Sequence, residues 1–286
     1  MSHLATLGVA AAQIRCVPGD LEANVRTHLD AIDAARARHT DVLVFPELSI
    51  TGHHGGAQAL QVAIRLDDAR IRAIAEAAGP MSTTFGIVEE GDAALFYNSA
   101  VTVRDGGIAH VHRKVNLATY GRLDDGKHFG AGRSVEGFPV RSLWRASVLI
   151  CADTWNPALV HVAALKGTTL LLVPVSSAVE AVDPAFDNAA GWSVNVTFHA
   201  LTYGMPVVMA NRIGAEGDLS FWGGSRIVDP FGNVVASASS DEALVAARLD
   251  YDDVRTARYR LPTVRDANLS MLRDELARLA HRRPTS

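Results

Sequence analysis

Three residues with reactive side chains, Glu47, Lys114 and Cys151, each stand close to the end of a short apolar stretch of the chain. A cysteine supplies a nucleophile, a carboxylate can accept and return a proton, and an ammonium group can stabilise an oxyanion. Together these three groups are suited to attack on a carbonyl-type carbon through a covalent intermediate. We therefore interpret them as one catalytic set rather than as three unrelated residues.

The chemistry assigns a role to each residue of this set. Cys151 would be the nucleophile, and Glu47 would accept its proton and later give that proton to a leaving nitrogen. Lys114, together with the backbone N–H of Ala152, would hold the oxyanion. Because a helix is expected to begin at Pro157, soon after Cys151, we expect the positive end of its dipole to lower the pKa of the thiol. Taken singly, such residues are more often structural, so the interpretation depends on their combination.

The elements that must position these residues alternate between strand and helix in both halves of the chain. Apolar periodicity and turn residues predict helices over residues 21–38, 67–79, 157–166, 193–203, 252–259 and 266–281. Strands are predicted over residues 8–13, 42–45, 83–88, 98–104, 108–114, 146–150, 169–173, 206–210, 224–228, 234–237 and 242–249. This alternation implies an α/β layered sandwich with mixed sheets. In such folds reactive groups gather beyond the carboxyl ends of the strands, where loops form a cleft.

Composition limits the class of protein. The chain has 286 residues, 48% of them apolar, and a formal charge of −4, which fits a folded protein without a basic surface for nucleic acid. It has no apolar run of the roughly 18 residues that span a bilayer, and no signal peptide is recognised. We expect no membrane association, a cytoplasmic location, and reduced thiols at Cys16 and Cys151. No linker composition interrupts the chain, so we predict one domain over residues 1–286.

Several motifs carry a resemblance to a known family. Residues 45–52 resemble the FPEL-x-x-x-G glutamate motif of the nitrilase superfamily, the carbon–nitrogen hydrolases. Residues 112–117 are similar to its [YH]-R-K-x-x-L lysine motif, and residues 150–155 to the C-x-D-x-W form of its cysteine motif. Residues 211–214 and 221–232 are similar to a late pattern of the same family. The motifs occur in the family's order and spacing, and jointly they are highly specific.

The resemblance covers roughly residues 5–250 and implies the family's αββα four-layer sandwich. It implies a Glu47–Lys114–Cys151 triad that needs no metal and no organic cofactor. It also implies a homodimer or a higher homo-oligomer. A helical tail over residues 251–286 is expected to form part of the interface.

One position departs from the family pattern. Many members carry a second glutamate in the loop that follows the lysine, and Asp125 occupies that position here. The carboxylate is kept but is shorter by one methylene, so Asp125 is predicted to support Lys114 or to help position a substrate. Its neighbour Asp124 is the alternative, and both aspartates could instead be solvated loop residues.

Further residues are candidates for the substrate pocket because they follow strand ends or the cysteine motif. These are Trp155, Asn156, Ser176, Ser177 and Trp222, with Asn156 alternatively capping the helix that begins at Pro157. His53 and His54 lie in the glutamate loop and are weaker candidates. His110 and His112 alternate on one strand without a third ligand, so we interpret them as solvent-facing residues rather than a metal site. Specificity is expected to lie in loops 48–60, 116–133, 176–192 and 213–222.

The residues and the resemblance together predict a hydrolase that cleaves a non-peptide C–N bond of a small-molecule amide through a thioester, releasing ammonia or an amine. A nitrile or an N-carbamoyl compound is an alternative substrate. A second hypothesis is a glutaminase-type ammonia supplier, since the motifs also resemble the amide-transfer domain of glutamine-dependent NAD synthetases. We expect no synthetase domain within these 286 residues, so that role would require a separate partner. A third hypothesis is a non-catalytic scaffold that keeps the fold.

Overall fold

The structure is a computed structural model that describes residues 6–53, 58–183 and 185–282. The first of its two large sheets is built mostly from the N-terminal half of the chain. Its strands lie in the order β14 (Ala243–Asp250), β1 (Thr6–Gln13), β2 (Val42–Val44), β3 (Ser82–Glu90), β4 (Phe96–Arg104) and β5 (Gly107–Arg113). The three strands β1, β2 and β3 run parallel, and the outer strands pair antiparallel. Every residue of β2 is buried, as expected for a central parallel strand covered on both faces.

The second sheet repeats this plan with the C-terminal half. Its strands lie in the order β13 (Val234–Ser237), β12 (Arg226–Val228), β9 (Val207–Asn211), β8 (Leu170–Val175), β7 (Trp144–Val148) and β6 (Gly137–Arg141). Strands β7, β8 and β9 are the parallel trio here. The sequence predicted all of these strands except β6, which pairs antiparallel with β7 and forms the edge of the sheet.

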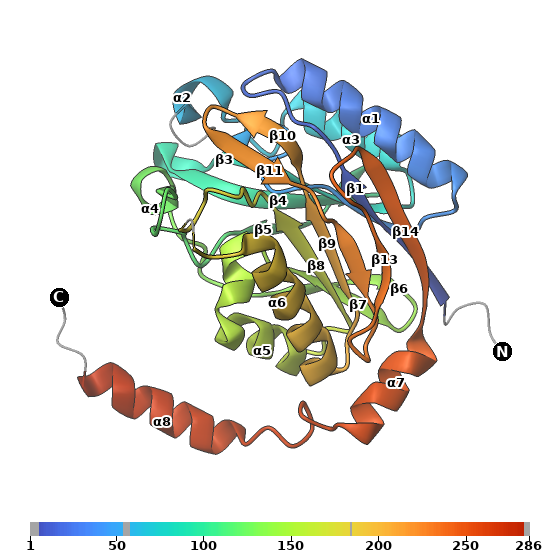
Figure 1. The fold of residues 1–286 in the computed structure, drawn as a ribbon, viewed down its shortest axis with the longest axis vertical. Helices are drawn as coiled ribbons and strands as arrows, with labels where there is room; N and C mark the ends of the chain where they lie inside the picture. The colour runs from blue at the N-terminus through green and yellow to red at the C-terminus, as the bar shows by residue number, and fades with distance from the viewer. Residues whose placement is uncertain (1–5, 54–57, 184, 283–286) are drawn as a thin grey trace.

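Helices cover the outer face of each sheet. The first pair is α1 (Leu21–Ala37) and α3 (Ala69–Ala78), and the second pair is α5 (Pro157–Leu165) and α6 (Asn188–Tyr203), on opposite sides of the molecule in Figure 1. Each begins where its sequence supplies a side-chain cap: the carboxylates of Asp20, Asp68 and Asp187 and the amide oxygen of Asn156 accept hydrogen bonds from the first helical N–H groups. Three of these helices begin within two residues of their predicted starts, whereas α6 begins at Asn188, five residues before the predicted start at 193, because Asp187 caps it there.

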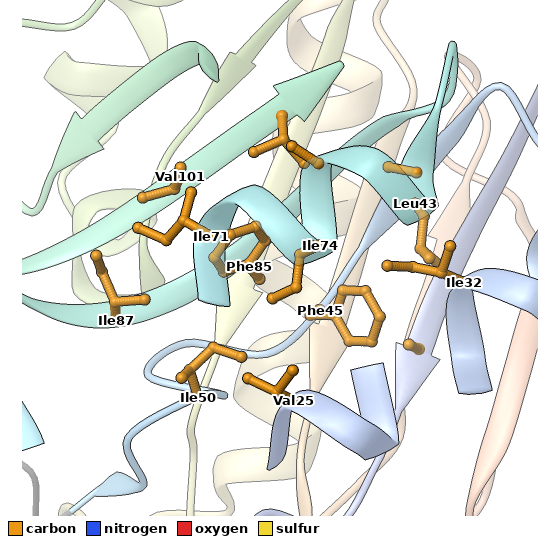
Figure 2. Close-up of a cluster of buried hydrophobic side chains, with 14 of the residues drawn as sticks. Val25, Ile32, Leu43, Phe45, Ile50, Ile71, Ile74, Phe85, Ile87 and Val101 are labelled. Carbon is orange, nitrogen blue, oxygen red and sulfur yellow. The ribbon is translucent and has the colours of Figure 1, made fainter. Parts of the chain in front are cut away.

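Three apolar layers hold the sandwich together. Figure 2 shows the first, in which Val25 and Ile32 of α1 and Ile71 and Ile74 of α3 pack over Phe45 and the outer face of the first sheet. The second lies between the two sheets, where strands β1 and β2 face β7, β8 and β9. The third joins the second sheet to α5 and α6. The αββα architecture expected from the sequence is confirmed.

Smaller elements complete the loops around one end of the sandwich. They are α2 (Ala59–Val62), the 3-10 turns Asp92–Ala94 and Cys151–Trp155, α4 (Asp125–His128), and the hairpin of β10 (Ile213–Glu216) and β11 (Leu219–Trp222). The tail forms α7 (Tyr251–Arg260) and α8 (Leu269–Arg282). Figure 1 shows α8 extending away from the layers.

Candidate active site

A cavity of about 360 Å³ lies at the end of the sandwich where strands β2, β5, β7 and β8 finish, and Glu47, Lys114 and Cys151 all line it. The three residues come from chain segments that are more than 30 positions apart, and the two sheets bring them together. The sheets are joined at this point by a hydrogen bond from the backbone N–H of Glu47 to the carbonyl oxygen of Val175, at 3.3 Å.

The Glu47 carboxylate is buried and fixed by three hydrogen bonds. Its Oε1 accepts from Lys114 Nζ at 2.6 Å and from Asn98 Nδ2 at 2.8 Å, and its Oε2 accepts from the backbone N–H of Ser176 at 3.0 Å. These donors hold the carboxylate in one orientation beside Cys151 and Lys114. Asn98 was not among the residues predicted from the sequence, because nothing distinguishes it there from any polar residue on β4.

Lys114 lies between two carboxylates. Its Nζ donates to Glu47 Oε1 and to Asp125 Oδ2, both at 2.6 Å. Burial acts to lower the pKa of Lys114, but the charges of Glu47 and Asp125 overcome this and raise its pKa well above the ordinary value. The side chain is therefore an ammonium group at neutral pH.

Asp125 is the aspartate that reaches the site. It begins the short helix α4, and its Oδ2 accepts from Lys114 and also from the backbone N–H of Ala118 at 3.1 Å. Asp124 instead points to the surface and contacts His128 at 3.2 Å. The shorter side chain thus reaches Lys114 because α4 carries its backbone close to the cavity.

Cys151 opens the 3-10 turn Cys151–Trp155 with a backbone φ of 44°, in the left-handed region that non-glycine residues rarely occupy. Burial and the neighbouring Glu47 carboxylate raise the pKa of its thiol well above the ordinary value, although Lys114 opposes them. The lowered thiol pKa expected from the following helix is therefore wrong: α5 begins at Pro157 as expected, but burial and the Glu47 charge outweigh the effect of its N-terminus. The thiol needs a base to become a nucleophile.

Asp153 joins the cysteine segment to the lysine segment. Its Oδ1 accepts from the backbone N–H groups of Val115 and Asn116 at 3.0 and 2.7 Å, and its Oδ2 accepts from the N–H of Ile150 at 3.0 Å. The same Oδ2 lies 2.8 Å from His112 Nε2. His112 is therefore buried and paired, and its interpretation as a solvent-facing residue was wrong; His110 is half-buried and stacks on Phe138.

The remaining predicted pocket residues divide into two groups. Trp155, Ser176 and Ser177 line the cavity, as does His53, while His54 lies outside the described residues. Asn156 does not line it, because its Oδ1 accepts from the N–H of Ala158 and caps α5. Trp222 faces an adjoining cavity, and its Nε1 donates to Ser177 Oγ at 3.2 Å. These two assignments to the substrate pocket are corrected accordingly.

The backbone of Ala152 follows Cys151 directly, and its carbonyl oxygen accepts from Asn116 Nδ2 at 3.0 Å. Cys16 and Cys151 are both free thiols, and Cys16 is buried away from the cavity lining. Within the described part of the chain, no group of three or more His, Cys, Asp or Glu side chains could hold a metal ion. Over the same residues, no helix combines the length and apolarity needed to cross a membrane.

The chain is similar to a protein-family model, to individual known proteins and to a solved structure. Residues 8–259 match the family model described as carbon-nitrogen hydrolase. An (R)-stereoselective amidase of a Pseudomonas species is 33% identical over 258 residues, which cover 88% of each chain. A glutamine-dependent NAD(+) synthetase of Thermotoga maritima is 27% identical over 92% of this chain, which spans only 48% of that protein. The crystal structure of a carbon-nitrogen hydrolase from Helicobacter pylori G27 has a TM-score of 0.82 at 23% identity, covering 96% of this chain and 99% of that one.

Proposed function

This chain belongs to the carbon–nitrogen hydrolase family, and from that premise we propose that it hydrolyses the C–N bond of a small-molecule amide through a cysteine thioester. The observation that carries this proposal is the Glu47 carboxylate. It is hydrogen-bonded to Lys114 at 2.6 Å and lines the same cavity as Cys151. A base, a cation and a thiol thus border one space in which an amide fits.

In the first half of the reaction, the Cys151 sulfur attacks the amide carbon while Glu47 accepts the thiol proton. A raised thiol pKa makes this proton transfer necessary, because little thiolate is present at neutral pH. The charge that develops on the amide oxygen is stabilised by the Lys114 ammonium and the N–H of Ala152. The C–N bond then breaks, Glu47 returns the proton to the leaving nitrogen, and ammonia or an amine departs from the thioester.

In the second half, a water molecule attacks the thioester carbon while Glu47 accepts one of its protons. The new tetrahedral intermediate collapses, the C–S bond breaks, and the sulfur takes back a proton to regenerate the thiol. The acid is released, so the net reaction is amide plus water giving acid plus ammonia or amine. Asp125 acts on this sequence by holding Lys114 in place.

Ammonia release from a panel of aliphatic and aryl-alkyl amides, glutamine, nitriles and N-carbamoyl compounds tests the proposal, with Cys151→Ala alongside wild type. We expect turnover of amides by wild type and none by the variant, with a thioester adduct trapped on Cys151 and detected by mass spectrometry. Carbon dioxide release would show that an N-carbamoyl compound is the substrate instead of an amide. Turnover of nitriles alone would show that the substrate is a nitrile. No turnover, together with ordinary iodoacetamide reactivity of Cys151, would favour a non-catalytic scaffold.

The similarity to the amide-transfer part of a glutamine-dependent NAD(+) synthetase supports a second candidate, an ammonia supplier to a partner synthetase. This candidate requires glutamine to be the preferred amide. It also requires an ATP-dependent synthetase to co-purify with the chain. We further propose that two copies of the chain associate, with the tail helix α8 in the interface.

A further inference from the structure

The lining of the cavity includes an aromatic wall formed by Trp155, Phe186 and Trp192. Trp155 packs edge-to-face on Trp192 at 5.4 Å and on Phe186 at 6.0 Å between ring centroids. Gly191 makes room for this packing, since a Cβ there would lie 2.8 Å from Phe186 and 3.2 Å from Trp155. The wall is therefore a fixed apolar surface.

Aliphatic side chains form another part of the lining, which we call the aliphatic wall, with Leu123 from one loop and Ala181 and Val182 from another. The two loops are held together by a hydrogen bond from the N–H of Arg122 to the carbonyl oxygen of Ala181 at 3.0 Å. Gly121, at φ 60°, permits this approach because a Cβ there would lie 2.3 Å from the same oxygen. An acyl group in the cavity would thus meet both aromatic and aliphatic carbon.

The charged groups that line the cavity, among the residues the structure describes, are Glu47, Lys114 and Asp125, and they are bonded to one another. Burial lowers the pKa of His53, so this imidazole is neutral at neutral pH. Burial also raises the pKa of Tyr120 to about 12, so its phenol is neutral as well. Among the described lining residues, a substrate carboxylate or ammonium would therefore find no group of opposite charge outside this ion-paired set.

Two amide side chains of the lining already donate to the backbone, while the Ser176 hydroxyl has no partner among the described residues and carries no charge. Asn116 Nδ2 donates to the carbonyl oxygen of Ala152, and Asn188 Nδ2 donates to that of Ala178 at 2.9 Å. The guanidinium of Arg122 borders the adjoining cavity instead, where it lies 3.5 Å from Asp218. A charged acyl group would lose its hydration without gaining an ion pair, which is costly.

We propose that this site selects amides whose acyl group is uncharged and apolar, of the size of a branched alkyl chain or a single aromatic ring. It disfavours amides whose acyl group carries a carboxylate or an amine, glutamine and ω-amides of dicarboxylic acids included. The proposal rests on the amide hydrolysis proposed above and names its substrate class. The burial of roughly 100 Å² of apolar substrate surface against the two walls corresponds to a factor of about 70 in kcat/KM.

Two pairs of substrates of matched shape test the selectivity. 4-Methylpentanamide and succinamate differ by an isopropyl group in place of a carboxylate, and butanamide and 3-aminopropanamide differ by a methyl group in place of an ammonium. We expect the neutral member of each pair to have a kcat/KM at least about 100-fold higher, and 3-phenylpropionamide to exceed acetamide by a similar factor. A charged member within about 10-fold of its neutral partner would overturn the proposal.

A cation placed in the wall provides a variant test. Val182→Arg should raise kcat/KM for succinamate by at least about 10-fold and lower kcat/KM for 4-methylpentanamide. The control is Leu143→Arg, which adds the same charge at an exposed turn outside the cavity and should change neither kcat/KM value. Phe186→Ala is the second variant, because the ring is 39% exposed and its loss should be tolerated. It should lower kcat/KM for 3-phenylpropionamide by about 10-fold without a similar loss for acetamide. Unchanged ratios in both variants would contradict the proposed role of the walls.

Titration calorimetry tests the substrate selectivity independently of the hydrolysis reaction. Cys151→Ala should bind 4-methylpentanamide and leave succinamate unbound at the same concentration. Binding of succinamate at equal affinity, or binding of neither amide, would overturn the selectivity. Absence of turnover by wild type with any amide would instead overturn the proposed hydrolysis, and the calorimetric result would still decide the selectivity.

Discussion

At the scale of single residues, the state of the Cys151 thiol decides how the proposed reaction starts. Burial and the Glu47 charge raise its pKa well above 9.0, the ordinary value for a thiol. We expect the rate of Cys151 alkylation by iodoacetamide in the free enzyme to keep rising with pH above pH 9, because only the thiolate reacts. Peptide mapping by mass spectrometry measures this rate at Cys151 separately from Cys16, with Cys151→Ala as the control. A plateau below pH 8 would show a thiolate stabilised in the free enzyme.

Asp153 acts one step away from the reacting atoms, as a positioning residue. Its carboxylate holds the backbone after Lys114 and the backbone before Cys151. In Asp153→Asn one acceptor oxygen becomes a donor, and hydrogen bonds to a charged group contribute roughly 1.5–3 kcal/mol each. We therefore expect a fall of about 10- to 100-fold in kcat, with a smaller change in KM.

The control for this prediction is Asp124→Asn, which alters an exposed carboxylate on the neighbouring loop and should leave kcat unchanged. A structural role alone would lower the melting temperature without changing the pH profile of kcat. A shifted profile in Asp153→Asn at preserved thermal stability would identify a positioning effect. Equal kcat values in the two variants would contradict it.

At the scale of elements, β3 must let the glutamate loop pass close to its backbone. A Cβ on Gly86 would lie 2.1 Å from the backbone nitrogen of Leu48, the residue after Glu47. Leu48 itself has a φ of 51°. Gly86→Ala should therefore displace Glu47 or open the strand, lowering the unfolding free energy by about 1–3 kcal/mol and kcat by at least about 10-fold. Urea unfolding and steady-state kinetics measure the two effects.

Gly107→Ala is the matched control for this prediction. Gly107 begins β5, and a Cβ added there would meet no atom within 4 Å. It should keep both stability and kcat near the wild-type values. If Gly86→Ala behaved in the same way, the tight fit of the glutamate loop on β3 would not matter for the site.

The helices and strands also show which parts of the fold could be predicted from the sequence alone. Long periodic segments such as α1 and the β4–β5 hairpin were predicted because their burial follows helical or alternating spacing. Strand β6 was missed because it has only five residues, Gly137 to Arg141, and Pro139 in its middle argues against a strand. The hairpin of β10 and β11 was treated as a loop because its strands have four residues each.

The candidate site shows the same limit. The positions of Glu47, Lys114 and Cys151 follow from their motifs, and Asp125 follows from its place in the loop. The roles of Asn98 and Asp153 depend on contacts with residues 51 and 38 positions away in the sequence, which no local pattern contains. The burial of His112 was missed for the same reason, since its partner lies 41 positions away.

At the scale of the whole molecule, the tail helix α8 exposes a stripe of apolar side chains to solvent. Leu269, Leu272, Leu276 and Leu279 repeat at helical spacing, and three of them are more than half exposed. An isolated helix of 14 residues is marginally stable in water, so this stripe requires a packing surface. The outer face of α6 offers one, because Val194, Phe198 and Leu201 are exposed there at the same spacing. A second copy of the chain would let α8 of one copy cover α6 of the other.

We therefore expect light scattering after size exclusion to give twice the mass of one chain. The double variant Leu276→Asp/Leu279→Asp should weaken association by at least about 100-fold, because burial of a leucine contributes roughly 1.5–3 kcal/mol. Ser270→Asp/Ala277→Asp adds the same charge on the opposite side of α8 and should leave the mass unchanged. A monomeric wild type at high micromolar concentration, or equal behaviour of the two variants, would rule out this interface.

The same interface would act on the substrate cavity. Helix α6 begins at Asn188 and carries Trp192, and both residues line the cavity. Cover on the outer face of α6 would hold its inner face, and therefore the aromatic wall, in a fixed position. Dilution below the dissociation constant of the dimer should then lower kcat/KM for apolar amides while leaving the value for acetamide nearly constant. A parallel loss for both substrates would mean that association supports the fold as a whole rather than the wall.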